Sequence, residues 1–162
     1  MKFKSFVLAM ILLLPALAIG KKEEKLRVPA GSNIPSLGIA LDASYDPLTD
    51  QIVPGYKILS VALTNNSINI MQLDKANDRW IVVDVKGKKH KAVSDLKELN
   101  PELYLSLQQK LRQLLEYPSL IQVGETVVVD LLIKENVGLE GFKLVSFSNN
   151  VSKMEFEIIS QE

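Results

Sequence analysis

The sequence predicts a mainly β protein, folded as an antiparallel β-sandwich with one inserted amphipathic α-helix. Two stretches carry this prediction, Tyr56–Asn65 and Thr126–Lys134, because apolar residues occupy alternate positions in both. About eight or nine short strand patterns separated by turn residues support the same fold class. We expect the alternating apolar residues of the two main strands to be buried and to face one another across two sheets; they are Leu59, Val61, Leu63, Val127, Val129 and Leu131.

Residues 1–20 have the features of a signal peptide. Two lysines precede an apolar run, residues 6–14, which is shorter than the roughly 20 residues that a membrane-spanning helix needs. Small residues then offer cleavage after Ala18 or Gly20. We therefore expect an exported protein, periplasmic or secreted, with no transmembrane anchor after signal cleavage. An uncleaved membrane anchor is the alternative.

The composition excludes several kinds of chemistry. The chain has 19 basic and 19 acidic residues, and residues 1–20 hold two of the basic ones, so the remaining chain has a net charge of −2. A general nucleic-acid binder would be strongly basic, and we expect no nucleic-acid partner. The absence of cysteine excludes disulfides and attachment of lipid to an N-terminal cysteine. With a single histidine as well, a transition-metal site is disfavoured, and no cofactor is expected.

The rest of the chain is predicted to form one domain behind a short linker. Residues 21–36 are charged at first and then rich in residues that punctuate loops, so we expect a flexible linker. Residues 37–162 are expected to form the sandwich. Within it, a hairpin is predicted around Gly87, with Trp80 at the start of the first arm as a core or rim aromatic.

One amphipathic helix is predicted at residues 101–116. Asn100 and Pro101 are typical of a helix start, and Pro118 is typical of a stop. Leucines recur at helical spacing along one side; they are Leu103, Leu107, Leu111, Leu114 and Leu115. We expect this leucine stripe to pack on the sandwich of the same chain. The alternative is a surface for a partner protein.

The most localised charge feature is a basic cluster in the predicted hairpin, formed by Lys86, Lys88, Lys89, His90 and Lys91. Such a patch attracts phosphate or carboxylate groups, which makes it a candidate binding site. The alternative is a charged edge strand, because lysines on an edge deter pairing between molecules. His90 is the single histidine, and we interpret it as a solvated surface residue rather than a general base.

Several polar motifs are interpreted as turns. Asp42, Asp46 and Asp50 lie in or beside one loop that could surround a calcium ion, but they lack the spacing of a calcium-binding loop. Aspartates that bond to nearby backbone groups are the simpler interpretation. Two N-x-S sequons, at residues 65–67 and 150–152, are interpreted as turns for the same reason.

Three motifs of the sequence follow one another in an order that is also found in a known family. A strand ends at the N-x-S corner of residues 65–67, a G-E-T turn at residues 124–126 precedes another long strand, and an FKLVSF run at residues 142–147 follows. This order resembles the immunoglobulin-like domains of unknown function in exported bacterial proteins, and the resemblance spans residues 37–159. It implies an immunoglobulin-like sandwich acting as a non-enzymatic binding or structural module, and it supplies no catalytic residues.

We therefore expect a non-catalytic protein-interaction or structural module of the cell envelope, with an unknown envelope or secreted protein as its partner. Two alternatives stay open. The protein could bind anionic envelope polymers or lipid head groups through the basic hairpin at residues 86–91. It could also be a small enzyme or enzyme inhibitor that uses its end loops, and the long loop at residues 46–55 is the support for this alternative. Binding through the hairpin would weaken steeply with salt, which distinguishes it from binding through an apolar interface.

Overall fold

The computed structural model describes residues 25–29, 32–34 and 38–160, with side chains from residue 38 onward. The predicted signal peptide, residues 1–20, lies outside these ranges. The described residues form the following elements: β1 (Lys25–Pro29), β2 (Ser32–Ile34), β3 (Ile39–Tyr45), the 3₁₀ helix η1 (Pro47–Gln51), β4 (Tyr56–Asn65), β5 (Met71–Gln72), β6 (Arg79–Val83), β7 (Lys89–Ala92), α1 (Leu96–Leu99), α2 (Pro101–Ser106), α3 (Gln109–Leu114), β8 (Leu120–Ile121), β9 (Thr126–Lys134), β10 (Leu144–Asn149) and β11 (Met154–Ile159).

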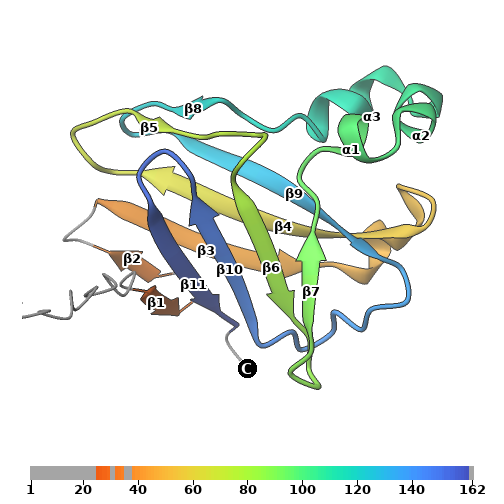
Figure 1. Ribbon diagram of the computed structural model, residues 1–162, viewed down its shortest axis with the longest axis horizontal. Coiled ribbons are helices and arrows are strands. Elements are labelled where there is room, and N and C mark those ends of the chain that lie inside the picture. Colours follow the sequence, from red (N-terminus) through yellow and green to blue (C-terminus); the bar gives the residue numbers. More distant parts are fainter. Residues whose placement is uncertain (1–24, 30–31, 35–37, 161–162) are drawn as a thin grey trace, which may run out of the picture.

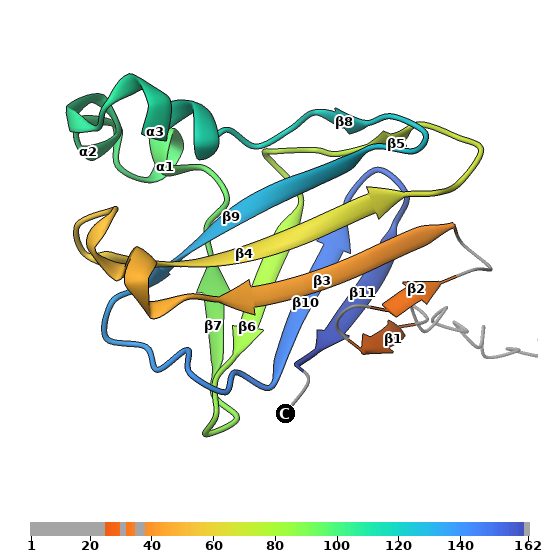
Figure 2. The same cartoon turned by 180° about the vertical axis from the view of Figure 1, so that it is seen from behind.

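Two sheets pack face to face as a β-sandwich, with their strands crossing (Figures 1 and 2). One sheet has five strands in the order β1-β11-β10-β6-β7, and the other has four in the order β2-β3-β4-β9. Strands β5 and β8 form a separate two-stranded ribbon. This ribbon and the turn of the β6–β7 hairpin lie at opposite edges of the molecule (Figure 1). The prediction of a mainly β sandwich is confirmed.

An aromatic stack fills the centre of the five-stranded sheet's inner face. The ring centroids of Trp80 and Phe147 are 4.0 Å apart, and those of Phe147 and Phe156 are 5.8 Å apart. Trp80 is 2% exposed, which confirms it as a core aromatic. Leu59, on β4, belongs to the same core and is fully buried. The two sheets therefore share one apolar interior.

Strands β4 and β9 are neighbours within the same sheet, so the prediction that their apolar residues face one another across two sheets was wrong. Their residues pair laterally in antiparallel register: Leu59 with Leu131, Val61 with Val129, and Leu63 with Val127. All are buried except Val127, which is partly buried. A period-2 pattern shows that one face of a strand is buried, but it does not show which strands are neighbours.

Two short strands lie inside the segment that was predicted to be a flexible linker. Strand β1 pairs with β11 in parallel, and β2 pairs with β3 antiparallel. The other described strand pairs are antiparallel. The prediction of a flexible linker is therefore wrong for residues 25–29 and 32–34. An extended segment beside a sheet edge satisfies its backbone hydrogen-bonding groups by pairing with that edge. The remaining residues of 21–36 lie outside the described ranges.

Two short helices, α2 and α3, replace the single helix predicted at residues 101–116. Helix α1 precedes that segment, and α2 and α3 are separated at Leu107 and Gln108, whose backbones are extended, with ψ angles of 151° and 146°. Ser106 contributes to the break, because its Oγ donates to the Leu103 carbonyl at 2.7 Å and competes with the helical pattern. Helical spacing of leucines indicated the right secondary structure but not this interruption. None of the helices among the described residues has the length and apolar character needed to cross a membrane.

Two asparagines tie the β5–β8 ribbon to the ends of both sheets. Asn65 ends β4; its Nδ2 donates to the Ile121 carbonyl at 3.0 Å, and its Oδ1 accepts from the amide and hydroxyl of Ser67. Asn149 ends β10 in the same way: its Nδ2 donates to the Gln72 carbonyl, and its Oδ1 accepts from the amide and hydroxyl of Ser152. Both sequon segments are therefore turns, as predicted.

Candidate functional site

The β6–β7 hairpin turns through a three-residue loop. The amide of Gly87 donates to the Asp84 carbonyl at 2.9 Å, and the amide of Asp84 donates to the Lys88 carbonyl at 3.0 Å. Gly87 has a φ of +81°, the left-handed conformation that such a loop needs at its last position. The predicted hairpin around Gly87 is confirmed, and it places the basic cluster at and beside the tip.

The carboxylate of Asp84 organises the tip. Its Oδ1 accepts from the amides of Lys86 and Lys88 at 2.9 and 2.8 Å, and its Oδ2 lies 2.8 Å from Nε2 of His90. The hydrogen bond from His90, followed by that from the Lys88 amide, holds the pKa of the Asp84 carboxyl below its usual value. The carboxylate is therefore ionised at neutral pH, and its lone pairs serve the turn.

His90 is not the solvated surface residue that we expected. Its side chain is 16% exposed, and that of Asp84 is 9% exposed. An ionised carboxylate only accepts hydrogen bonds, so Nε2 of His90 carries the proton that they share. Side chains alternate between the two faces along β7, so His90 points toward the sandwich interior on the same face as the buried Ala92. The neighbours of His90 in the sequence are lysines, which indicated an exposed position instead.

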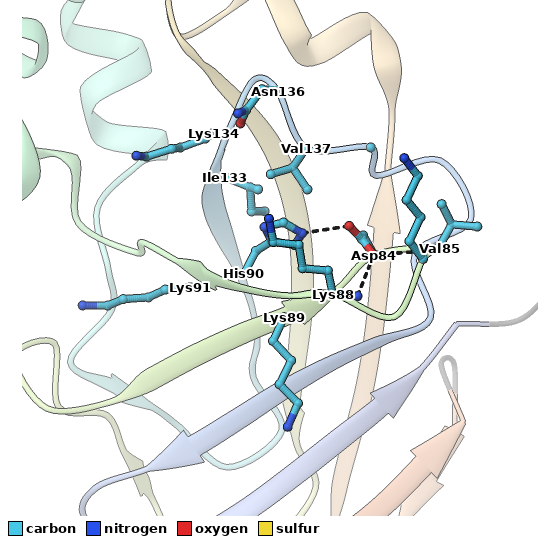
Figure 3. A pocket seen from close by; sticks show the side chains of 12 residues that line it. Asp84, Val85, Lys88, Lys89, His90, Lys91, Ile133, Lys134, Asn136 and Val137 are labelled. Atoms are coloured by element: carbon cyan, nitrogen blue, oxygen red, sulfur yellow. Dashed lines mark hydrogen bonds and ion pairs between the residues drawn. The ribbon is translucent and has the colours of Figure 1, made fainter.

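A cavity of about 570 Å³ lies beside the hairpin, between β7 and the end of β9 (Figure 3). Five exposed lysines contribute to its lining; they are Lys86, Lys88, Lys89, Lys91 and Lys134. His90, Ile133, Asn136 and Val137 also line it. We call this cavity the hairpin pocket. Its volume is in the range of about 300–1,000 Å³ that small-molecule sites occupy.

The structure brings all five residues of the predicted basic cluster to the hairpin pocket, and it adds residues that the sequence did not indicate. Asp84 was missed, although an aspartate three positions before the glycine of a hairpin turn is a usable signal. Lys134 and Asn136 come from β9 and the loop after it. No local signal links them to the hairpin, because their position depends on how the sheets are joined.

The leucine stripe packs on the outer face of the four-stranded sheet. Leu115 is buried in a second apolar cluster with Ile58 of β4 and Leu132 of β9. Three other leucines of the stripe pack against that cluster; they are Leu103, Leu107 and Leu111. Leu114 is 67% exposed. Packing on the same chain is thus confirmed for four of the five leucines, which leaves little of the stripe for a partner.

The aspartates of the 46–55 loop serve its structure. Asp46 caps η1 by accepting from the Leu48 amide at 2.9 Å. Asp50 accepts from the Tyr45 hydroxyl and lies 3.6 Å from the Lys57 ammonium group. Burial, together with this hydrogen bond, raises the pKa of Tyr45 to about 12. Within residues 38–160, no three histidine or acidic side chains gather in a way that could hold a metal ion.

No family model matches the chain, and no curated protein matches it. Among solved structures, the chain is similar to an uncharacterised β-sandwich protein from Clostridium difficile 630. The two are 13% identical with a TM-score of 0.37, and the match covers 86% of this chain and 96% of that chain.

Proposed function

We propose that this protein is an exported, non-catalytic interaction module of the cell envelope, with an immunoglobulin-like sandwich as its scaffold, and that it binds anionic groups in the hairpin pocket. The observation that carries this proposal is the position of Lys134. Lysines on β7 alone are explained by protection of an edge strand. That explanation does not extend to a lysine from β9 that lines the same cavity from the other side.

The charge of the hairpin pocket is uncompensated within the described part of the chain. Asp84 is the single acidic residue among the described residues of the lining, and it is engaged by His90 and two backbone amides. Within residues 38–160, no acidic side chain forms an ion pair with the five lysines. Concentrated positive charge in a concave site attracts carboxylates or phosphates. Residues 21–162 have a net charge of only −2 when these lysines are included, so the positive charge is local to the pocket.

The lining also supports a binding role over a catalytic one. Among the described residues that line the pocket, none carries a hydroxyl or thiol side chain that could act as a nucleophile. His90 and Asp84 are bonded to each other, and Asp84 also holds the turn. The lysines are the groups that remain available to a ligand.

The test is a cross-linked pull-down from the native envelope fraction with the mature protein. The variant Lys89→Gln/Lys91→Gln is compared with Lys97→Gln/Lys110→Gln, whose lysines are exposed but lie outside the pocket. We expect the first variant to lose its cross-linked partner and the second to retain it. Capture by the wild type should weaken as salt is raised above about 0.15 M. Equal capture by both variants would contradict the proposal.

A further inference from the structure

Strand β7 has an unpaired edge, and the register shows which residues form it. In an antiparallel pair of strands, every second residue hydrogen-bonds to the partner strand. The amide of Asp84 bonds to the carbonyl of Lys88, so the register of β6 and β7 makes the backbone groups of His90 and Ala92 bond to β6. Those of Lys89 and Lys91 therefore point away from β6. Val93 continues this alternation, since its amide donates to the Leu132 carbonyl at 3.0 Å and its carbonyl accepts from the Leu132 amide at 2.8 Å.

The hairpin pocket lies where β7 and β9 separate. Val93 and Leu132 form an isolated bridge between the two sheets. On one side of that bridge, Lys89 and Lys91 line the pocket from β7, and Lys134 and Asn136 line it from the end of β9 and the following loop. Among the described residues, no backbone group pairs with Lys89 or Lys91 on this side. The pocket thus contains a short open sheet edge together with the lysines.

We infer that an extended acidic segment of a partner protein binds here as an added strand, pairing with Lys89 and Lys91 of β7 while its carboxylates contact the lysines. This inference rests on the proposed function and names the partner's chemistry. Backbone pairing with the edge provides affinity, and alternate side chains provide specificity. Opposite charges on paired strands add to the stability of the pairing.

The arrangement of the lysines favours an extended ligand over a compact phosphate. Lys89 and Lys91 are two positions apart on one strand and lie about 7 Å apart along it, which matches alternate residues of a partner strand. A compact phosphate is better served by donors that converge, such as an arginine fork, and the described residues of the pocket lining include no arginine. The same lysines repel a second copy of this edge, so they select an acidic strand over self-association.

The experiment measures binding of a capped six-residue peptide of alternating threonine and glutamate by isothermal titration calorimetry. Two analogues carry N-methyl groups, one on the threonine amides and one on the glutamate amides, so that each loses the donors of one strand edge and keeps its charge. We expect the wild type to bind the parent peptide in a salt-dependent manner. One of the two analogues should lose about tenfold or more in affinity.

Matched variants test the protein side of the pairing. Lys91→Thr removes the charge and keeps the backbone amide, whereas Lys91→Pro removes both. We expect Lys91→Thr to weaken binding and Lys91→Pro to weaken it further, with Lys97→Thr unchanged. Thermal unfolding establishes whether each variant is folded. If Lys91→Pro does not fold, the methylated peptides still test strand addition, because they are used with the wild type.

Three outcomes would overturn the inference. Equal affinity for the parent peptide and both analogues, with dependence on the lysines, would leave the anion-binding function intact and exclude strand addition. Lysine-dependent binding of inorganic phosphate or of phosphatidylglycerol vesicles, without binding of the peptide, would assign the pocket to phosphate groups. Failure of every anionic probe to bind, with unchanged pull-down by the Lys89→Gln/Lys91→Gln variant, would remove the proposed function itself.

Discussion

The Asn65 corner and the β6–β7 hairpin lie at opposite edges of the sandwich, and both are polar turns at the end of a strand. They differ in where their polar groups are directed. At the corner, Asn65 is fully buried and its amide group is satisfied within the protein. At the hairpin, Lys89 and Lys91 are exposed and line a cavity. Internal bonding makes the first turn a structural clamp, whereas the outward charge beside the second turn is the basis of the binding function proposed above.

The clamped edge extends beyond Asn65. Asp78 accepts from the Tyr117 hydroxyl at 2.8 Å and from the amides of Asp74 and Asn150. Asn149 joins the same region by bonding to the Gln72 carbonyl. These contacts connect loops that are far apart in the sequence, so the loss of one buried partner leaves others unsatisfied.

The largest expected effect comes from the same substitution made at a glycine on each edge. Gly38 and Gly87 both have positive φ angles, of +63° and +81°. An added Cβ at Gly38 would lie 2.6 Å from the backbone of Ser67, whereas one at Gly87 would meet no atom within 4 Å. Gly38→Ala should therefore cost about 2–5 kcal/mol, from strain and overlap together, and Gly87→Ala about 1–2 kcal/mol from strain alone. Urea unfolding measures both, and equal losses would show that the two edges are packed alike.

A smaller effect is expected from truncating the clamp. Asn65→Ala removes the acceptor of the Ser67 amide and the donor to the Ile121 carbonyl in a buried site. We expect a loss of about 3 kcal/mol in the free energy of unfolding, because buried partners stay unsatisfied. Asn66→Ala is the matched control: this neighbour is exposed, and its substitution should change stability by less than about 0.5 kcal/mol. A loss below about 1 kcal/mol for Asn65→Ala would show that water replaces the clamp.

Much of the fold was predictable because its signals are local. Alternation in Tyr56–Asn65 and Thr126–Lys134 identified two long strands, Gly87 located the hairpin, and the leucines indicated helical structure. The run of three apolar residues at Leu131, Leu132 and Ile133 is a further local signal, because it indicates a strand that is buried on both faces. Strand β9 is covered by the core on one face and by the helices on the other.

The candidate site was predictable only on the hairpin side. The lysines of residues 86–91 form a local cluster, but Lys134 and Asn136 join them through the bridge between Val93 and Leu132, which is a property of the topology. The same limit explains why β4 and β9 were placed in different sheets. The side-chain bond of Ser106 contributes to the interruption at Leu107, and helical periodicity gives no signal of such a bond.

Each edge also contains an aspartate that is hydrogen-bonded to an aromatic side chain, and the two pairs contribute to stability in different pH ranges. Tyr117 and His90 each lie 2.8 Å from the Oδ2 of an aspartate, Asp78 and Asp84 respectively. Burial, with the bond to Asp78, raises the pKa of Tyr117 well above its ordinary value of 10.0. The bond from His90 instead holds the pKa of Asp84 below its ordinary value of 3.8. The Tyr117–Asp78 pair is thus sensitive to alkali, and the His90–Asp84 pair is sensitive to acid.

The sign of each contribution follows from which state binds the proton more tightly. Folded Tyr117 keeps its proton more strongly than the unfolded chain, so its stabilisation is complete below pH 10.0 and is lost as pH rises above that value. Folded Asp84 releases its proton more readily, so its stabilisation is present above 3.8 and is lost as pH falls through the lowered folded value. Tyr45 adds to the alkaline loss, and Asp74, whose pKa is also lowered, adds to the acid loss.

The smallest expected effect is therefore a change of slope measured by urea unfolding across pH. Tyr117→Phe should cost about 2 kcal/mol at neutral pH, because a bond to a charged acceptor is lost, and should reduce but not abolish the fall in stability above about pH 10. Tyr45 supplies the remaining slope. Asp84→Asn should leave the alkaline fall unchanged and flatten only part of the acid fall, since Asp74 is retained. An alkaline slope that is the same in the wild type and Tyr117→Phe would mean that Tyr117 ionises in the folded protein, and the clamped edge would then be as open to solvent as the hairpin.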